Sequence, residues 1–117
     1  MKSVVALRLN RRVTILRRAE ARDPTYNTVQ VEWVPLGSVW AEVRDLLPSR
    51  AERVAEAVDL AQRPSRVRMR YRTDVDTTKR LSWDGRTFLI VSGPAELGNR
   101  EGIELVAEEL STVGQEP

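Results

Sequence analysis

The sequence predicts a mainly β protein, a small antiparallel β-barrel of five to six strands with one helix or long loop inserted between the second and third main strands. Residues 66–72 alternate strictly between arginine and apolar side chains, and an Asp-Gly pair at 84–85 separates two short apolar runs. Turn-forming residues divide the other apolar segments. The 117 residues, 41% of them hydrophobic, suit a single domain, 1–117, with one core.

Two candidate strands near the amino terminus should form a long, bent pair. Residues 12–18 are rich in β-branched side chains, and residues 22–27 hold the proline and asparagine of a turn. A period of two then runs through residues 29–44, with an interruption at Pro35 and Gly37. Because proline cannot donate a ladder hydrogen bond, we expect an edge or a bulge at this interruption.

The pattern changes in residues 46–62, the inserted segment. Ser49 and Glu52 have the spacing of a capping box, and apolar side chains recur at helical intervals from Ala51 to Val58. The sequence therefore predicts a helix of about three turns, or a long loop, at this place. Its apolar stripe consists of alanine and valine, so burial would hold the segment only weakly.

The remaining strands are short. We predict strands at 66–72, 79–82, 87–91 and 103–108, and a loop at 92–99. The Asp-Gly pair at 84–85 suits the positive φ angles of a two-residue hairpin turn. The two ends of the chain, 1–10 and 111–117, are expected to be flexible.

Side chains of one parity along these strands give the predicted core. Its members are Val13, Ile15, Val31, Trp33, Val39, Ala41, Val43, Val67, Met69, Tyr71, Phe88, Ile90, Ile103 and Leu105. Trp40 has the opposite parity from Val39 and Ala41, so its ring is expected on the outer face. Tryptophan in such a place favours a contact with another protein, while stacking on nucleobases is the alternative.

Composition excludes most enzyme chemistry. Cysteine and histidine are both absent, which removes disulfides, thiolate nucleophiles, zinc sites with nitrogen or sulfur ligands, and imidazole triads. We expect no enzymatic activity, no cofactor and no metal. The carboxylates at 74–76 lack the spacing of a calcium loop, so a solvated hairpin loop is favoured there.

Two further patterns concern the location of the protein. No run approaches the roughly 20 apolar residues that a membrane helix requires, so no membrane contact is expected. The chain reaches Arg11 and Arg12 before any signal-peptide core could form, which predicts synthesis in the cytoplasm.

Charge is distributed in blocks. Of the 19 basic residues 17 are arginine, and the net charge is +6 in 1–22, −4 in 23–62, +5 in 63–100 and −5 in 101–117. Blocks of opposite sign could provide the two unlike surfaces that a head-to-tail ring contact needs.

The arginine strand allows two interpretations. Arg66, Arg68, Arg70 and Arg72 should share one face, where they could meet a polyanion such as DNA or the acidic surface of a neighbour. Alternatively, they form a solvated face that pairs across strands with Glu104 and Glu108.

The order of the elements resembles a known family. A basic lead at 7–15 is followed by Val39-Trp40-Ala41-Glu42-Val43, an alanine-rich segment, the arginine strand, Leu81 to Val91 with its Trp-Asp-Gly turn, and a strand ending in Glu108-Glu109. Over residues 7–110 this set resembles the head–tail joining proteins of tailed bacteriophages and prophages, also called head-completion or stopper proteins. Relatives often carry a glycine and an acidic residue where this chain has Pro48 and Ser49.

The resemblance implies a structural virion protein of the phage neck, or connector, made in the host cytoplasm. Such proteins form a ring, commonly twelve-fold, beneath the portal and its adaptor. The ring closes the DNA channel after packaging and provides the surface on which the tail docks.

The resemblance gives the inserted segment a place, and the charge and exposure of individual residues suggest their contacts. The inserted segment would project toward the channel, where Arg50, Arg53 and Arg63 could contact the phosphates of double-stranded DNA without reading its sequence. Subunit or partner contacts would involve Trp40, Arg66, Arg68, Arg70, Arg72, Glu104 and Glu108. The alternative function is a free-standing, small-barrel nucleic-acid-binding module that uses the arginine strand and an exposed tryptophan.

Overall fold

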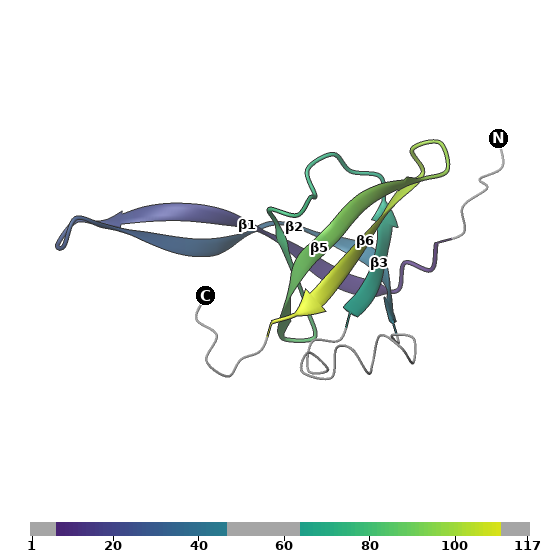
Figure 1. Ribbon diagram of the computed structural model, residues 1–117, viewed down its shortest axis with the longest axis horizontal. Coiled ribbons are helices and arrows are strands. Elements are labelled where there is room, and N and C mark those ends of the chain that lie inside the picture. The colour runs from purple at the N-terminus through teal and green to yellow at the C-terminus, as the bar shows by residue number, and fades with distance from the viewer. Residues whose placement is uncertain (1–6, 47–63, 111–117) are drawn as a thin grey trace, which may run out of the picture.

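The computed structural model describes residues 7–46 and 64–110, which form six antiparallel strands. These are β1 (Arg11–Asp23), β2 (Thr28–Asp45), β3 (Pro64–Arg70), β4 (Arg80–Trp83), β5 (Arg86–Leu97) and β6 (Gly102–Glu109). They close into a barrel in the order β1-β2-β3-β6-β5-β4 (Figure 1). The predicted antiparallel barrel is confirmed, and the helix predicted in the inserted segment lies outside the described residues. No helix in the described ranges is long and apolar enough to cross a membrane.

One hydrophobic core fills the barrel. It comprises Val13, Ile15, Ala41, Val67, Met69, Val75, Leu81, Trp83, Phe88, Ile90, Ile103, Leu105 and Ala107, with Val39 and Val43 packed against it. The rings of Trp83 and Phe88 stack with their centroids 3.5 Å apart. Strand alternation explains this set, because inward side chains recur at every second position in β3, β4 and β6.

Three residues predicted for the core are not in it. Val31 and Tyr71 are each 37% exposed, and Trp33 is only half-buried. Val31 and Trp33 lie where β1 and β2 have left the barrel, and Tyr71 follows the end of β3, so no second layer covers them. The core also contains four residues that were not predicted: Val75, Leu81, Trp83 and Ala107.

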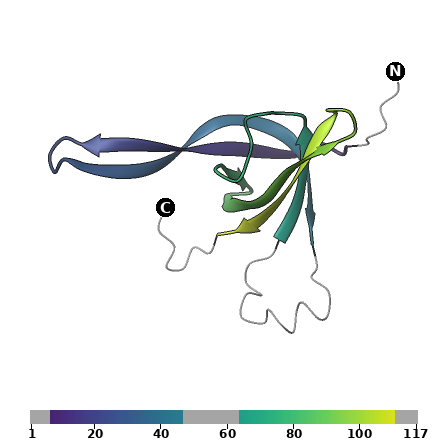
Figure 2. The same cartoon turned by 45° about the horizontal axis from the view of Figure 1, so that its top comes forward.

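Beyond the barrel, β1 and β2 continue as a two-stranded arm, residues 17–34 (Figures 1 and 2). Within the described chain, the arm strands pair only with each other, from Arg17 opposite Val34 to Asp23 opposite Thr28. A register shift beside Pro35 leaves Leu36 as the extra residue, so the predicted bulge is confirmed. An isolated hairpin is marginally stable in water, and the arm therefore depends on its attachment to the barrel.

The predicted loop at 92–99 is wrong, because β5 extends to Leu97. Its register with β6 shifts on both sides of Ser92, and Gly93 lies in this irregular stretch with φ +103°. A Cβ atom on Gly93 would lie 2.7 Å from the carbonyl oxygen of Glu104. Glycine and proline here mark a bulged strand that approaches its neighbour closely, a pattern that resembles a loop in sequence.

We expect Val67→Ala to lower the free energy of unfolding by about 1–3 kcal/mol, because it deletes two methyl groups from the core and leaves a cavity. Val67 is fully buried, whereas Val29 on the arm is 53% exposed. The matched control Val29→Ala should change the free energy by less than about 0.5 kcal/mol. Urea titration of both variants checks this, and equal losses would show that the arm is as closely packed as the barrel.

Candidate interaction surface

The alternation of β3 places its arginines on the outer wall of the barrel. Val67 and Met69 are fully buried, so Arg66, Arg68 and Arg70 point outward. Arg68 Nε donates to Glu104 Oε1 on β6 at 2.7 Å, and Arg66 Nη2 lies 3.5 Å from Glu42 Oε2 on β2. Two arginines of the row are therefore paired across strands within the chain.

Glu42 joins the amino-terminal segment to this wall. Its Oε1 accepts a hydrogen bond from the backbone N–H of Arg8 at 3.0 Å. This bond, together with the nearby guanidinium groups of Arg68, Arg66 and Arg44, holds the pKa of Glu42 below its ordinary value of 4.5 despite partial desolvation. The carboxylate is thus a fixed negative charge among arginines.

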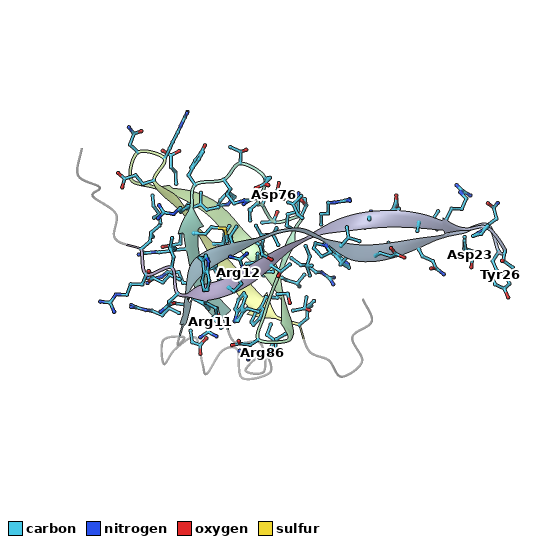
Figure 3. All side chains as sticks on the ribbon, turned by 180° about the vertical axis from the view of Figure 1, so that it is seen from behind. Arg11, Arg12, Asp23, Tyr26, Asp76 and Arg86 are labelled. Atoms are coloured by element: carbon cyan, nitrogen blue, oxygen red, sulfur yellow. The ribbon has the colours of Figure 1, made fainter. Side chains whose placement is uncertain are left out.

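Trp40 lies on the outer face, as predicted, with 52% of its surface exposed. The guanidinium carbon of Arg12 lies 5.3 Å from the centre of its ring, and the β2–β3 register places Arg70 on the neighbouring strand. Arg12, Arg44 and Arg70 are exposed, and within the described ranges none of them forms an ion pair. We call Arg12, Trp40, Arg44 and Arg70 the Trp40 surface; Figure 3 shows Arg12 on the barrel, far from Tyr26 at the tip of the arm.

Arg72 lies beyond the end of β3 and does not continue the row. Its Nε and Nη2 donate to the two carboxylate oxygens of Asp74 at 2.8 and 2.7 Å. These bonds lower the pKa of Asp74 from its ordinary value of 3.8. The pair stabilises the connection between β3 and β4.

Asp76, the second carboxylate in the connection between β3 and β4, also forms its hydrogen bonds within that connection. Asp76 Oδ1 accepts hydrogen bonds from the backbone N–H and the hydroxyl of Thr78, which lower the pKa of Asp76 below 3.8. In the described chain, no group of three or more aspartate, glutamate, histidine or cysteine residues could hold a metal ion. The favoured solvated hairpin loop at 74–76 is only partly right: the segment is a loop, but it joins strands that do not pair with each other, and Val75 within it is buried.

Other predicted site residues are placed differently. Glu108 on β6 stands opposite Leu89 and Pro64, not beside the arginine row. Arg50, Arg53 and Arg63 lie outside the described residues. The backbone N–H of Leu46 donates to the carbonyl of Pro64 at 2.9 Å, so the two ends of the inserted segment meet at one end of the barrel.

Sequence reasoning missed a cation that contacts the arm. The guanidinium carbon of Arg80 on β4 lies 4.1 Å from the centre of the Trp33 ring. Burial lowers the pKa of Arg80, and its Nε is buried without a hydrogen-bond partner in the described structure. Residue spacing carries no signal for this contact, because the pairing of β1 with both β2 and β4 brings Trp33 and Arg80 together from distant parts of the chain.

The lowered pKa of Asp74 predicts a specific acid response. Its stabilising effect should be complete above pH 3.8 and should be lost as the pH falls through the folded-state pKa. We expect Asp74→Asn to cost about 0.5–1 kcal/mol at neutral pH and to flatten the decline in stability below pH 3.8. Denaturant unfolding between pH 2 and 7 measures both effects, with Glu32→Gln on the arm as the control; an unchanged acid slope would contradict the assignment.

Comparisons with known proteins find one matching family and two similar structures. The family model described as phage head completion protein matches residues 6–110. The solution structure of protein SF1141 from Shigella flexneri 2a is similar, with 27% identity, a TM-score of 0.67, and coverage of 90% of this chain and 96% of that one. A chain in the virion of a native gene transfer agent particle shares the fold at 22% identity and a TM-score of 0.63, with coverage of 88% of this chain and 96% of that chain.

The search of curated protein sequences finds no match for this chain. The family match nevertheless spans the described barrel and arm, and the proteins of this family are structural components of the phage particle. The chain belongs to the phage head completion protein family.

Proposed function

We propose that the protein is a connector subunit that assembles as a ring, of twelve copies in the virion, below the portal and its adaptor. The ring closes the DNA channel after packaging and presents the surface on which the tail docks. Membership of the head completion family over residues 6–110 is the observation that carries this proposal. The similar chain in a gene transfer agent virion supports a place in a particle.

The Trp40 surface suits docking to another neck protein. An exposed indole flanked by arginines without ion pairs provides both the aromatic anchor and the charge typical of interface hot spots. Because Arg66 and Arg68 are already paired with glutamates, the arginines left for an acidic partner are Arg12, Arg44 and Arg70. This surface would meet an acidic patch on the adaptor above or on the tail protein below.

The inserted segment would serve as the gate. Its ends meet at Leu46 and Pro64, at one end of the barrel, which is where a projection into a channel would begin. Arg50, Arg53 and Arg63 are proposed to contact the DNA backbone there, a contact that needs charge and no base readout.

Deleting the gene from its phage should give filled heads that lose their DNA and carry no tails. The physical reason is that nothing would close the channel or receive the tail. Electron microscopy, nuclease sensitivity of the packaged DNA and plaque counts measure these outcomes, with expression of the wild-type gene in trans as the control. Infectious particles of normal yield from the deletion would refute the connector function.

The doubly substituted variant Trp40→Ala/Arg70→Glu should fold normally but fail to restore the deletion. Both residues are exposed, so we expect the free energy of unfolding to change by less than about 0.5 kcal/mol. The yield of infectious particles should fall at least tenfold, whereas Arg17→Glu on the arm should complement like wild type. Full complementation by the double variant would remove the Trp40 surface from the proposal.

The same surface also suits a second function, non-specific nucleic-acid binding, because a positively charged face with an exposed aromatic ring is what single strands bind. The two functions differ in their response to salt. A nucleic-acid-binding module should bind oligonucleotides with an affinity that falls steeply with salt concentration, and Trp40→Ala should weaken that binding. A connector subunit instead binds a portal–adaptor complex.

A further inference from the structure

The arm and the barrel wall meet at a corner that carries an exposed apolar surface. Along the arm, Val29, Val31 and Trp33 alternate on β2, and the hairpin register places them on the same face as Leu16 of β1. Leu16 stands opposite Arg80, and Arg80 stands opposite Leu89, so this face continues over the barrel. We call these six residues the corner surface.

The apolar part of the corner surface is open to solvent in the single chain. Val29 is 53% exposed, and Val31 and Leu89 are each 37% exposed. On the same face, this apolar row is bordered by the charged residues that stand opposite it on β1: Arg18, Glu20 and Arg22. An exposed apolar row with a charged border is typical of a contact with another protein. The two paired strands of the arm provide this contact with a long support.

Arg80 is the charge at the centre of this surface. It covers the Trp33 ring at 4.1 Å, it is half-buried, and no carboxylate of the described chain lies within ion-pairing distance. Its buried Nε has no hydrogen-bond partner there either. A partly desolvated cation without a counter-charge costs free energy, so a carboxylate brought by a partner would be strongly favoured at this place.

The opposite end of the molecule provides such a carboxylate. In the described chain, only Glu32, Glu96 and Glu108 among the acidic residues have neither a hydrogen bond nor an ion pair. Glu32 belongs to the arm itself, and Glu108 stands next to Leu89, on the same barrel wall as Arg80. Glu96 alone lies near the turn between β5 and β6, which projects from the side opposite the arm (Figures 1 and 2).

We propose that the corner surface of one copy binds the β5–β6 turn of a second copy, with Arg80 of the first paired to Glu96 of the second. The two surfaces differ and lie at opposite ends, so the contact is head-to-tail and can repeat from copy to copy. Val29 and Val31 would be covered by the neighbouring turn, in which Leu97 is half-buried and follows Glu96 directly. This contact would be the subunit interface of the proposed connector ring. Only the closure of the copies into a ring rests on that proposed function.

Charge reversal provides a test with the full chain. Arg80→Glu and Glu96→Arg should each reduce the self-association constant at least tenfold in analytical ultracentrifugation, because each places like charges together. Combining both changes in one chain should restore association. Mixing the two single variants should also restore association, with the two variants alternating along the assembly, because the corner of each variant then meets the turn of the other with opposite charges.

Two further variants separate loss of contact from loss of fold. Val31→Asp, at an exposed position, should abolish association while the circular dichroism spectrum stays unchanged. Glu32→Arg, one residue along the same strand and on the other face of the arm, should associate like wild type. Wild-type protein that stays monomeric at about 1 mM would overturn the contact, since interfaces of this kind are detectable at that concentration.

The outcome for the contact and the outcome for the connector are distinguishable. Association of Arg80→Glu and Glu96→Arg at wild-type strength would overturn the contact and leave the deletion phenotype to decide the function. Association that the single variants lose and the mixture or the combined swap regains, together with a deletion that yields normal particles, would support the contact and refute the connector.

Discussion

Closure of the barrel depends on β4, a strand of four residues. It pairs with β1 at three positions and with β5 at four, and it places Leu81 and Trp83 in the core. Because β4 is so short, it covers only part of the edge that β1 presents. The rest of β1 leaves the barrel with β2 as the arm, and the outward Arg80 at the start of β4 becomes the point where arm and barrel meet.

On the outer wall, some of the arginines form ion pairs within the chain and others do not. On β2, β3 and β6, Glu42 and Glu104 neutralise the two arginines at the centre of the wall. Cross-strand pairs of this kind stabilise a sheet modestly, by about 0.2–1 kcal/mol each. The arginines at the margins, around Trp40, have no ion pair within the described chain, so the unpaired charge of this wall lies at its margins.

Local alternation predicts the strands of the barrel, including the arginine strand, while the Asp84-Gly85 pair predicts the turn and Pro35 predicts the bulge. Alternation failed for Val31 and Trp33, because a period of two identifies the residues that share a face and not whether another layer covers that face. Alternation likewise continued past the end of β3 into Tyr71 and Arg72. Val75 and the contact of Arg80 with Trp33 carry no periodic signal, since both arise from how distant segments meet once the barrel closes. The order of the elements was enough to recognise the family. It did not show that the paired strands β1 and β2 extend beyond the barrel as an arm.

The hydrogen bond from the N–H of Leu46 to the carbonyl of Pro64 lies at the boundary between the barrel and the connection from β2 to β3. The ladder between these strands already holds both ends of the connection at a fixed distance. Lengthening a connection between fixed ends is inexpensive, since each doubling costs only about 0.6 kcal/mol of chain entropy. Evolution can therefore vary the length and chemistry of this connection while the core stays the same.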